Sequence, residues 1–209
     1  MNSTLDLACE LRQRLSCLDD ASLDRLFRDG RSHSAWQTRP VSNTLLEELW
    51  ALAQFAPTSV NGMPARLVFV TSASGKQRLQ PCLSPGNVDK VLSAPVTVII
   101  AFDMNFWQHL PRLFPHADVS GMFRDDHAAS EECAFRNSSL QAAWLMLAAR
   151  ALGLDCGPMS GFDRQAVDRE FFAGTGVCSN FLCNLGYGDA SKLYQRLPRL
   201  SFEEVCTYA

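Results

Sequence analysis

The 209-residue chain lacks the features that mark several large classes of protein. It has no run of about 18 apolar residues, which argues against a membrane-spanning helix. The segment Met1 to Cys17 carries four charged residues where a secretory signal peptide needs an unbroken apolar stretch, so we expect a cytoplasmic protein. Lys and Arg number 19 against 22 Asp and Glu, and this net charge of −3 argues against a nucleic-acid-binding protein.

Signatures of metal sites and of common nucleophiles are missing as well. The eight cysteines include no C-x-x-C pair and the four histidines no H-x3-H pair, so we predict no metal site and expect the cysteines to act as small core residues. There is no G-x-G-x-x-G and no G-x-x-x-x-G-K-[ST] loop. Ser160 lies near two glycines but outside a G-x-S-x-G elbow, which argues against a serine hydrolase.

What is present is the composition of an ordinary globular protein, with 47% hydrophobic and 20% charged residues. The length predicts a single domain over 1–209 that can bury a core without disulfides. Residues 1–26 are expected to form an N-terminal helical extension. Three apolar runs predict strands, at 66–71, 96–102 and 180–185.

Capping residues and apolar periodicity predict the helices. Ser42 is the expected N-cap of a helix that stops before Pro57, and Asp163 that of another. Two short helices are expected within 4–28, the second starting near Asp20 and stopping at Gly30. The remaining helices are expected over 74–81, 86–93 and 128–152, with a short one after the capping box Ser201-x-x-Glu204. Gly153 is expected to end the longest helix, and a glycine-containing turn to follow it through Gly161.

The longest predicted helix is apolar on every side from Ala142 to Ala149. Such a helix must be central in the fold or covered by another subunit. Strands and helices alternate irregularly without repeats, so we expect an α+β fold with a mixed central sheet flanked by helices. Residues 103–126 mix aromatic residues with prolines and predict a helix with a mobile segment, a candidate lid.

Polar loops lie between these elements. Together they contain the groups that a phosphorylated ring cofactor requires: cations for a phosphate, amides and hydroxyls for a ring edge, and glycine where the backbone approaches the ligand closely. Each of them alone could equally be a solvated loop. They lie at 31–34, 57–61, 87–90, 158–161 and 192–199.

The sequence resembles the FMN-dependent nitroreductase superfamily and, within it, the malonic semialdehyde reductases of uracil catabolism. The broad resemblance runs from about residue 27 to the C-terminus. The closer one rests on four runs: Ala134-Phe-Arg-Asn-Ser-Ser139, Ala151-Leu-Gly-Leu-Asp155, Gly157-Pro-Met-Ser-Gly-Phe-Asp-Arg-Gln165 and Leu197-Pro-Arg-Leu-Ser-Phe-Glu-Glu204. The resemblance implies a homodimer with the long helix at its interface, non-covalently bound FMN, and NADH or NADPH as co-substrate.

The resemblance also implies a role for each loop in holding FMN. Arg31, Ser32 and His33 match the segment that holds the phosphate and ribityl chain, with Ser34 where relatives have a second cation. The C-terminal cations Lys192 and Arg199, with Arg196 as a further candidate, match residues that hold the phosphate. The other implied contacts are Asn87 and Lys90 at the flavin pyrimidine edge, Pro158, Met159, Ser160 and Gly161 at flavin N5, and Pro57, Thr58, Ser59 and Asn61 reaching the flavin of the partner subunit.

Two readings of the substrate remain open at the level of sequence. One is malonic semialdehyde (3-oxopropanoate), reduced to 3-hydroxypropanoate by ping-pong hydride transfer, with Arg66 or Arg136 as a candidate cation for this small anion. The other is a broad-specificity quinone or nitro-compound reductase. Met63-Pro64-Ala65 departs from the Gln-Pro-Trp of many relatives at the same loop. No catalytic side chain is assigned, and a flavin-binding or interaction protein without turnover is the alternative from a different class.

Overall fold

The computed structural model describes Glu10, Arg12 and residues 17–209. Its centre is a sheet of four strands within that part of the chain: β1 (Ala65–Val70), β2 (Val96–Asp103), β3 (Asp155–Met159) and β4 (Val177–Gly186). The strand order is β1-β2-β4-β3, and every neighbouring pair is antiparallel. β2 is buried along almost its whole length, as its continuous apolar run predicted.

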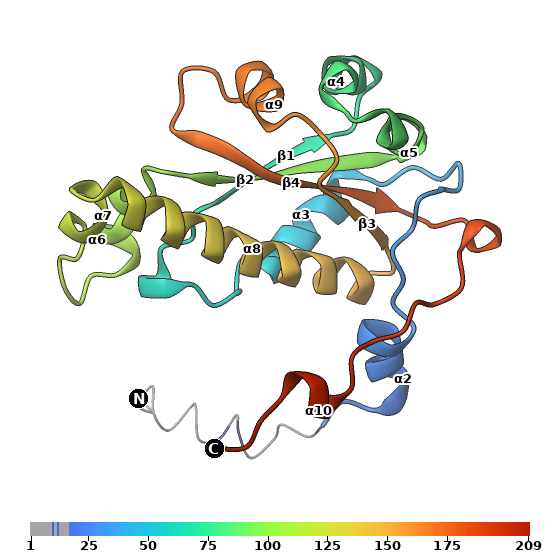
Figure 1. Ribbon diagram of the computed structural model, residues 1–209, viewed down its shortest axis with the longest axis horizontal. Coiled ribbons are helices and arrows are strands. Elements are labelled where there is room, and N and C mark those ends of the chain that lie inside the picture. Colours follow the sequence, from blue (N-terminus) through green and yellow to red (C-terminus); the bar gives the residue numbers. More distant parts are fainter. Residues whose placement is uncertain (1–9, 11, 13–16) are drawn as a thin grey trace.

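Helices cover both faces of this sheet, which confirms the α+β class (Figure 1). The long helix α8 (His127–Ala151) and α3 (Asn43–Ala53) pack on one face, and α4 (Ala73–Leu79), α5 (Val88–Ser93) and α9 (Arg164–Phe171) lie on the other. The sheet differs in one detail from the mixed sheet that we expected. Its strand pairs are all antiparallel, and parallel pairing among the described residues is limited to an isolated bridge between Ser32 and Cys156.

The capping residues act as predicted. Ser42 Oγ accepts a hydrogen bond from the Leu45 N–H at 3.2 Å, and Asp163 caps α9 through the Ala166 N–H at 3.0 Å. The capping box at Ser201 begins α10 (Phe202–Val205). Gly153 follows the end of α8 with a φ of +84°, a backbone conformation that glycine adopts without steric cost.

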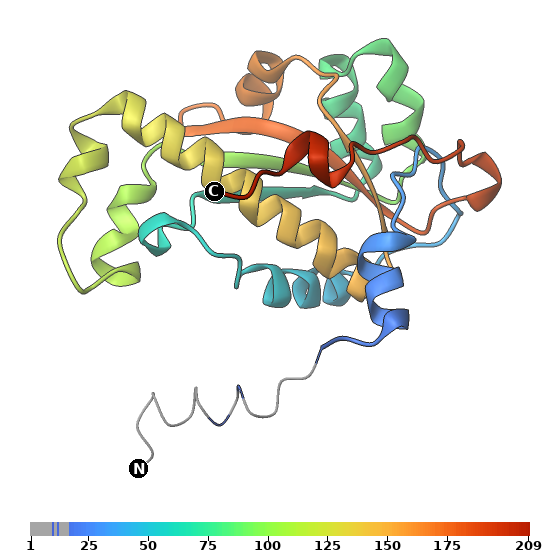
Figure 2. The same ribbon diagram turned by 60° about the horizontal axis from the view of Figure 1, so that its bottom comes forward.

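The N-terminal region contains α2 (Asp20–Leu23), which continues as a π-helical turn over Asp24–Arg28. The first of the two short helices expected within 4–28 lies mostly outside the described residues. Short 3-10 turns occur at Ser59–Asn61, Gln80–Cys82, Pro85–Asn87 and Ala190–Lys192. In Figure 2 the segment after β4 turns back across the molecule and continues into α10.

One local prediction was wrong, and the helix expected within 103–126 is confirmed as more than one helix. The segment after Gly153 contains the edge strand β3, where we expected only a turn, because an edge strand tolerates a proline such as Pro158. Residues 103–126 form a 3-10 turn (Phe106–His109) and two helices, α6 (Leu110–Leu113) and α7 (Gly121–Arg124). Buried aromatic side chains anchor them, with the Phe106 and Phe123 ring centroids 4.9 Å apart.

The core consists of apolar clusters on both sides of the sheet. Cys82, Cys133, Cys156 and Cys183 are buried in apolar clusters as free thiols, which confirms for these four the prediction that cysteines serve as small core residues. Cys178 is partly buried, and Cys17 and Cys206 are exposed, so the prediction was wrong for the last two. Of the helices formed by the described residues, none is both long and apolar enough to span a membrane.

Candidate functional site

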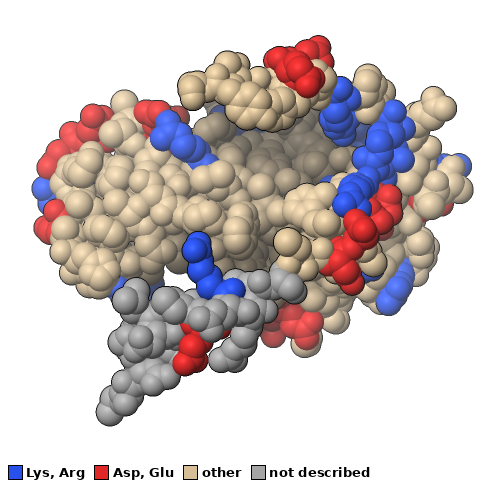
Figure 3. Space-filling view, turned by 90° about the horizontal axis from the view of Figure 1, so that it is seen from below, with Lys and Arg blue, Asp and Glu red and all other residues tan. Residues whose placement is uncertain are grey.

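A cavity of about 470 Å³ lies where the segment before α3 meets the chain after β4. Three of the residues that we predicted to hold a phosphate line it: Arg31, Ser32 and Arg199. Arg196 and Arg150 line it as well, so the cavity gathers four guanidinium groups. Figure 3 shows this side of the molecule with a hollow in its surface and Lys and Arg side chains at the rim. An anionic group fits such a donor set.

Backbone pairing with β3 fixes the position of residues 32–33, which lie next to Arg31 before α3. Ser32 forms the parallel bridge to Cys156, and the His33 N–H donates to the Cys156 carbonyl at 2.9 Å. The buried His33 ring places Nε2 3.5 Å from the Asp155 carboxylate and packs against Gly188, so His33 supports the cavity from behind without lining it. A Cβ on Gly157 would overlap the His33 carbonyl oxygen, and only glycine permits this approach.

Arg150 is a cavity residue that the sequence reasoning missed. Its Nη1 donates to the Leu26 carbonyl at 2.9 Å, and its guanidinium lies against Gly30, where a Cβ would come within 2.6 Å of the guanidinium carbon. Arg150 Nε is buried and has no hydrogen-bond partner among the residues that the structure describes. A basic residue in the last turn of a long helix is its only local signal, and that pattern usually means a favourable interaction with the helix dipole.

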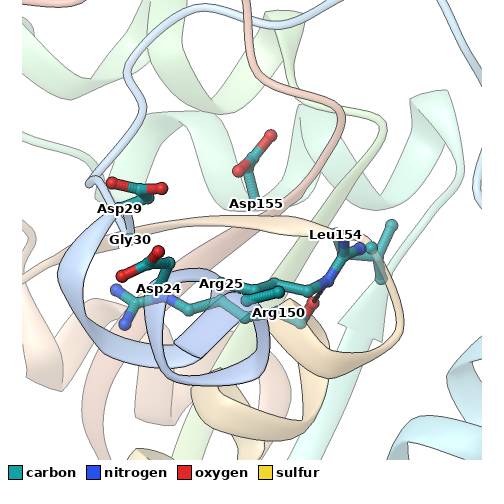
Figure 4. A pocket seen from close by; sticks show the side chains of 9 residues that line it. Asp24, Arg25, Asp29, Gly30, Arg150, Leu154 and Asp155 are labelled. Atoms are coloured by element: carbon teal, nitrogen blue, oxygen red, sulfur yellow. Dashed lines mark hydrogen bonds between the residues drawn. The ribbon is translucent and has the colours of Figure 1, made fainter. Parts of the chain in front are cut away.

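Arg150 also borders a second cavity of about 600 Å³. In Figure 4 the side chains of Arg25 and Arg150 lie together on one side of it, and Asp29 and Asp155 on another. Arg25 Nε donates to the Arg150 carbonyl at 2.9 Å and so caps the end of α8. The charges of this cavity are mixed, in contrast to the arginine-rich cavity beside it.

A second group of predicted residues meets at the other end of β3. Asn87 Nδ2 donates to the Gly161 carbonyl at 2.9 Å, and Lys90 Nζ donates to Asn87 Oδ1 at 3.1 Å. The Ser84 N–H donates to the same Gly161 carbonyl at 3.1 Å. A Cβ at Gly161 would lie 2.5 Å from Asn87 Nδ2, so this contact requires glycine. Hydrogen bonds therefore join the Asn87–Lys90 pair to the 158–161 turn.

The strand β3 connects the two groups. At about 3.3 Å per residue, the five steps from Cys156 to Gly161 span roughly 17 Å. Ser32 pairs with the first of these residues and Asn87 with the last. An elongated ligand with an anionic group at one end and a polar ring at the other fits this arrangement of donors.

The loop 57–61 lies elsewhere. The Ser59 N–H donates to Asn137 Oδ1 at 2.8 Å on α8, and Asn61 Nδ2 donates to the Leu113 carbonyl at 2.9 Å on α6. Thr58 Oγ1 accepts from the Met63 N–H at 3.2 Å, which closes the loop on itself. In Figures 1 and 2 this loop lies beside α6, at the opposite end of α8 from α2. Within one chain it does not join the other predicted site residues.

Three remaining candidates, Lys192, Arg66 and Arg136, lie outside the two groups. Lys192 is exposed and does not line the cavity, and Pro158 and Ser160 are exposed beside Gly161, while Met159 is partly buried. Arg66 Nη2 forms an ion pair with Asp103 at 2.6 Å and Arg66 Nη1 donates to two carbonyls, so Arg66 is not a free cation. Arg136 pairs with Glu132 one turn earlier on α8 and is exposed.

Comparison with known proteins gives the family. The model of the nitroreductase family matches residues 28–187. Among solved structures, a Bacillus subtilis protein described as a nitroreductase superposes with a TM-score of 0.83 at 22% identity, covering 91% of this chain and 100% of that one. A nitroreductase from Exiguobacterium sibiricum, solved in complex with FMN, gives 0.82 at 20% identity and covers 93% and 99%. An NAD(P)H:FMN oxidoreductase from Staphylococcus epidermidis gives 0.79 at 19% identity and covers 94% and 99%.

Proposed function

Since a family model covers most of its length, the chain belongs to the nitroreductase family, and we propose that it is an FMN-dependent oxidoreductase that takes electrons from NADH or NADPH. The carrying observation is that Arg31, Ser32 and Arg199 line one cavity while Asn87, Lys90 and Gly161 form one hydrogen-bonded group at the other end of β3. One of the similar structures was solved in complex with FMN, and another is described as an NAD(P)H:FMN oxidoreductase.

The chain's own residues would bind and orient FMN. Arg31, Ser32 and Arg199 would hold the phosphate by charge-assisted hydrogen bonds, with Arg150 offering its unpaired Nε. Lys90 would place positive charge beside the pyrimidine edge, where reduction of a flavin adds negative charge. Bound FMN supplies the hydride-transferring N5, and no protein general base is needed.

The direct test is chemical. The purified protein should be yellow, and acid precipitation should release one FMN per chain. Addition of NADH or NADPH without oxygen should bleach the bound flavin, and an oxidised acceptor should restore its colour. A colourless protein that takes up no FMN on titration, or a yellow one that neither nucleotide reduces, would contradict the proposal. The second result would instead indicate a flavin-binding protein without turnover.

We also propose a homodimer in which the loop 57–61 of each subunit reaches the FMN of the other. Large apolar side chains of α8 are left in water: Leu140 (44% exposed) and Trp144 (42%) lie one turn apart on the same face, and Phe135, on another side of the helix, is 45% exposed. A patch of this kind marks an interaction surface. The position of loop 57–61, remote from the other site residues of its own chain, supports a contribution in trans. Light scattering should give twice the chain mass, and a stable FMN-loaded monomer would contradict this.

The finer proposal concerns the electron acceptor. The four sequence runs shared with malonic semialdehyde reductases support reduction of 3-oxopropanoate to 3-hydroxypropanoate. The ion pair of Arg66 with Asp103 favours the alternative, a broad quinone or nitro-compound reductase, because it removes one candidate cation for a small anion. Steady-state kcat/KM for 3-oxopropanoate, menadione and a nitroaromatic separates the two. A clear preference for menadione or the nitroaromatic would reject the semialdehyde assignment.

A further inference from the structure

Lys76, on α4, is a buried cation without an anionic partner. Only 6% of the residue is exposed, and among the described residues no carboxylate lies within ion-pair distance of its ammonium. Burial of an unpaired charge is costly, and a hydrophobic side chain would fill the same space without that cost. The hydrogen bonds of the ammonium therefore need an explanation.

Those hydrogen bonds run from α4 through the sheet to α5. Lys76 Nζ donates to the Val91 carbonyl at 2.8 Å and to Thr97 Oγ1 on β2. Thr97 Oγ1 donates to Asn184 Oδ1 on the adjacent strand β4 at 2.6 Å. Asn184 Nδ2 completes the path by donating to the Lys90 carbonyl at 2.9 Å. Thr97 and Asn184 are both fully buried, so water cannot replace these bonds.

The two carbonyls held in this way belong to the last turn of α5. The last four carbonyls of a helix have no partner within it, and the six residues of α5 are too few for independent stability. A positive charge at a helix C-terminus is also favourable for the helix dipole. Within α5, Ser93 Oγ donates to the Asp89 carbonyl at 2.7 Å and to the Lys90 carbonyl at 3.4 Å. Lys76 and Asn184 add from outside the helix the shorter bonds to the Val91 and Lys90 carbonyls.

The end of α5 is coupled to the candidate flavin site. Lys90 supplies one of the clamped carbonyls, and its side chain turns back to Asn87, whose amide holds the Gly161 carbonyl. A displaced α5 would move the Lys90 ammonium and the Asn87 amide together. Figure 1 shows α4 and α5 side by side above the sheet, where this coupling is short.

We propose that Lys76 is a positioning residue: with Thr97 and Asn184 it clamps the last turn of α5 and so fixes Asn87 and Lys90 against Gly161. The role of this clamp in flavin binding rests on the proposed function. The clamp itself concerns the protein alone and is measurable without FMN.

The experiment compares three variants. Lys76→Met keeps the length of the side chain and removes its charge and donors, and Thr97→Val cuts the path without changing the shape of the residue. Arg78→Met is the matched control, because Arg78 lies on the same helix and loses an ion pair with Glu170 at 2.6 Å that points away from α5. Amide hydrogen exchange of residues 88–93 is measured on the FMN-free proteins, and FMN affinity and the midpoint potential of bound FMN on the loaded ones.

Lys76→Met and Thr97→Val should both speed exchange in 88–93, weaken FMN binding about tenfold, as expected for one misplaced charged contact, and lower the midpoint potential. Arg78→Met should do none of these. If Lys76→Met fails to fold, Thr97→Val carries the same comparison. Unchanged exchange in 88–93 would overturn the clamp, and faster exchange with unchanged FMN affinity and potential would overturn the positioning role. A wild type that binds no FMN would reject the proposed function, while the exchange data would still decide the clamp.

Discussion

Replacement of Arg31 by alanine should weaken FMN binding without unfolding the protein. Arg31 lines the arginine-rich cavity, and under the proposed function its guanidinium would make a charge-assisted contact to the FMN phosphate. Such a contact is worth about 1.5–3 kcal/mol, so the Kd for FMN should rise by roughly 10–150-fold. Flavin fluorescence titration of the FMN-free protein measures this directly. Arg199→Ala should produce a change of the same size.

The two variants should differ in a second respect. Arg31 Nη2 also donates to the Tyr194 carbonyl, whereas Arg199 bonds only to carbonyls of its own segment among the described residues. Arg31→Ala should therefore release the chain after β4 and speed its limited proteolysis, and Arg199→Ala should not. Arg39→Ala is the matched control, since Arg39 stacks 3.6 Å from the Tyr187 ring centre outside the cavity. Unchanged FMN affinity in both cavity variants would refute the placement of the phosphate.

Four further variants test the packing and electrostatics of the fold and the proposed dimer. Gly157→Ala should destabilise the protein by about 1–3 kcal/mol in chemical denaturation, because its Cβ overlaps the His33 carbonyl; wild-type stability would contradict the close approach. Burial lowers the pKa of Lys76 to about 8, so between there and its ordinary 10.5 the unfolded chain holds more protons. As pH rises through this window, the free energy of unfolding of wild type should increase relative to that of Lys76→Met, by about 3 kcal/mol at most. Cysteines titrate in the same pH range, but both proteins contain them, so their contribution drops out of the comparison. A difference in unfolding free energy that does not change with pH would contradict the burial of the charge. Leu145→Ala should cost about 2–5 kcal/mol because Leu145 is 1% exposed, whereas Leu140→Glu on the exposed face of α8 should leave the subunit folded and dissociate the proposed dimer in light scattering; a dimer that survives Leu140→Glu would place the interface elsewhere.

Most of the fold could be predicted from residues that lie close together in the sequence. The caps at Ser42 and Asp163, the apolar run of β2 and the glycine after α8 each depend on residues a few positions apart, and each was predicted correctly. The strand β3 was missed because Gly157 and Pro158 read locally as a turn, and only its pairing with β4 makes it a strand.

In the candidate site too, features set by nearby residues could be predicted and features set by long-range contacts could not. The polar loops could be picked out by residue type, but the pairing of Asn87 with Gly161 spans 74 positions and follows no local pattern. Arg150 was missed because its place beside Gly30 depends on how the N-terminal segment crosses the end of α8. The clamp at Lys76 was equally invisible, since a lysine on a short helix ordinarily faces solvent.

Whether this chain is a flavin-dependent oxidoreductase is tested most directly by anaerobic mixing of the FMN-loaded protein with NADH or NADPH. The reaction is followed in the visible absorption of the flavin. Bleaching by at least one nucleotide, and recovery on addition of 3-oxopropanoate, menadione or a nitroaromatic, is the result we predict. A protein that holds FMN in a 1:1 ratio and yet is bleached by neither nucleotide would contradict the central claim that this chain is a flavin-dependent oxidoreductase.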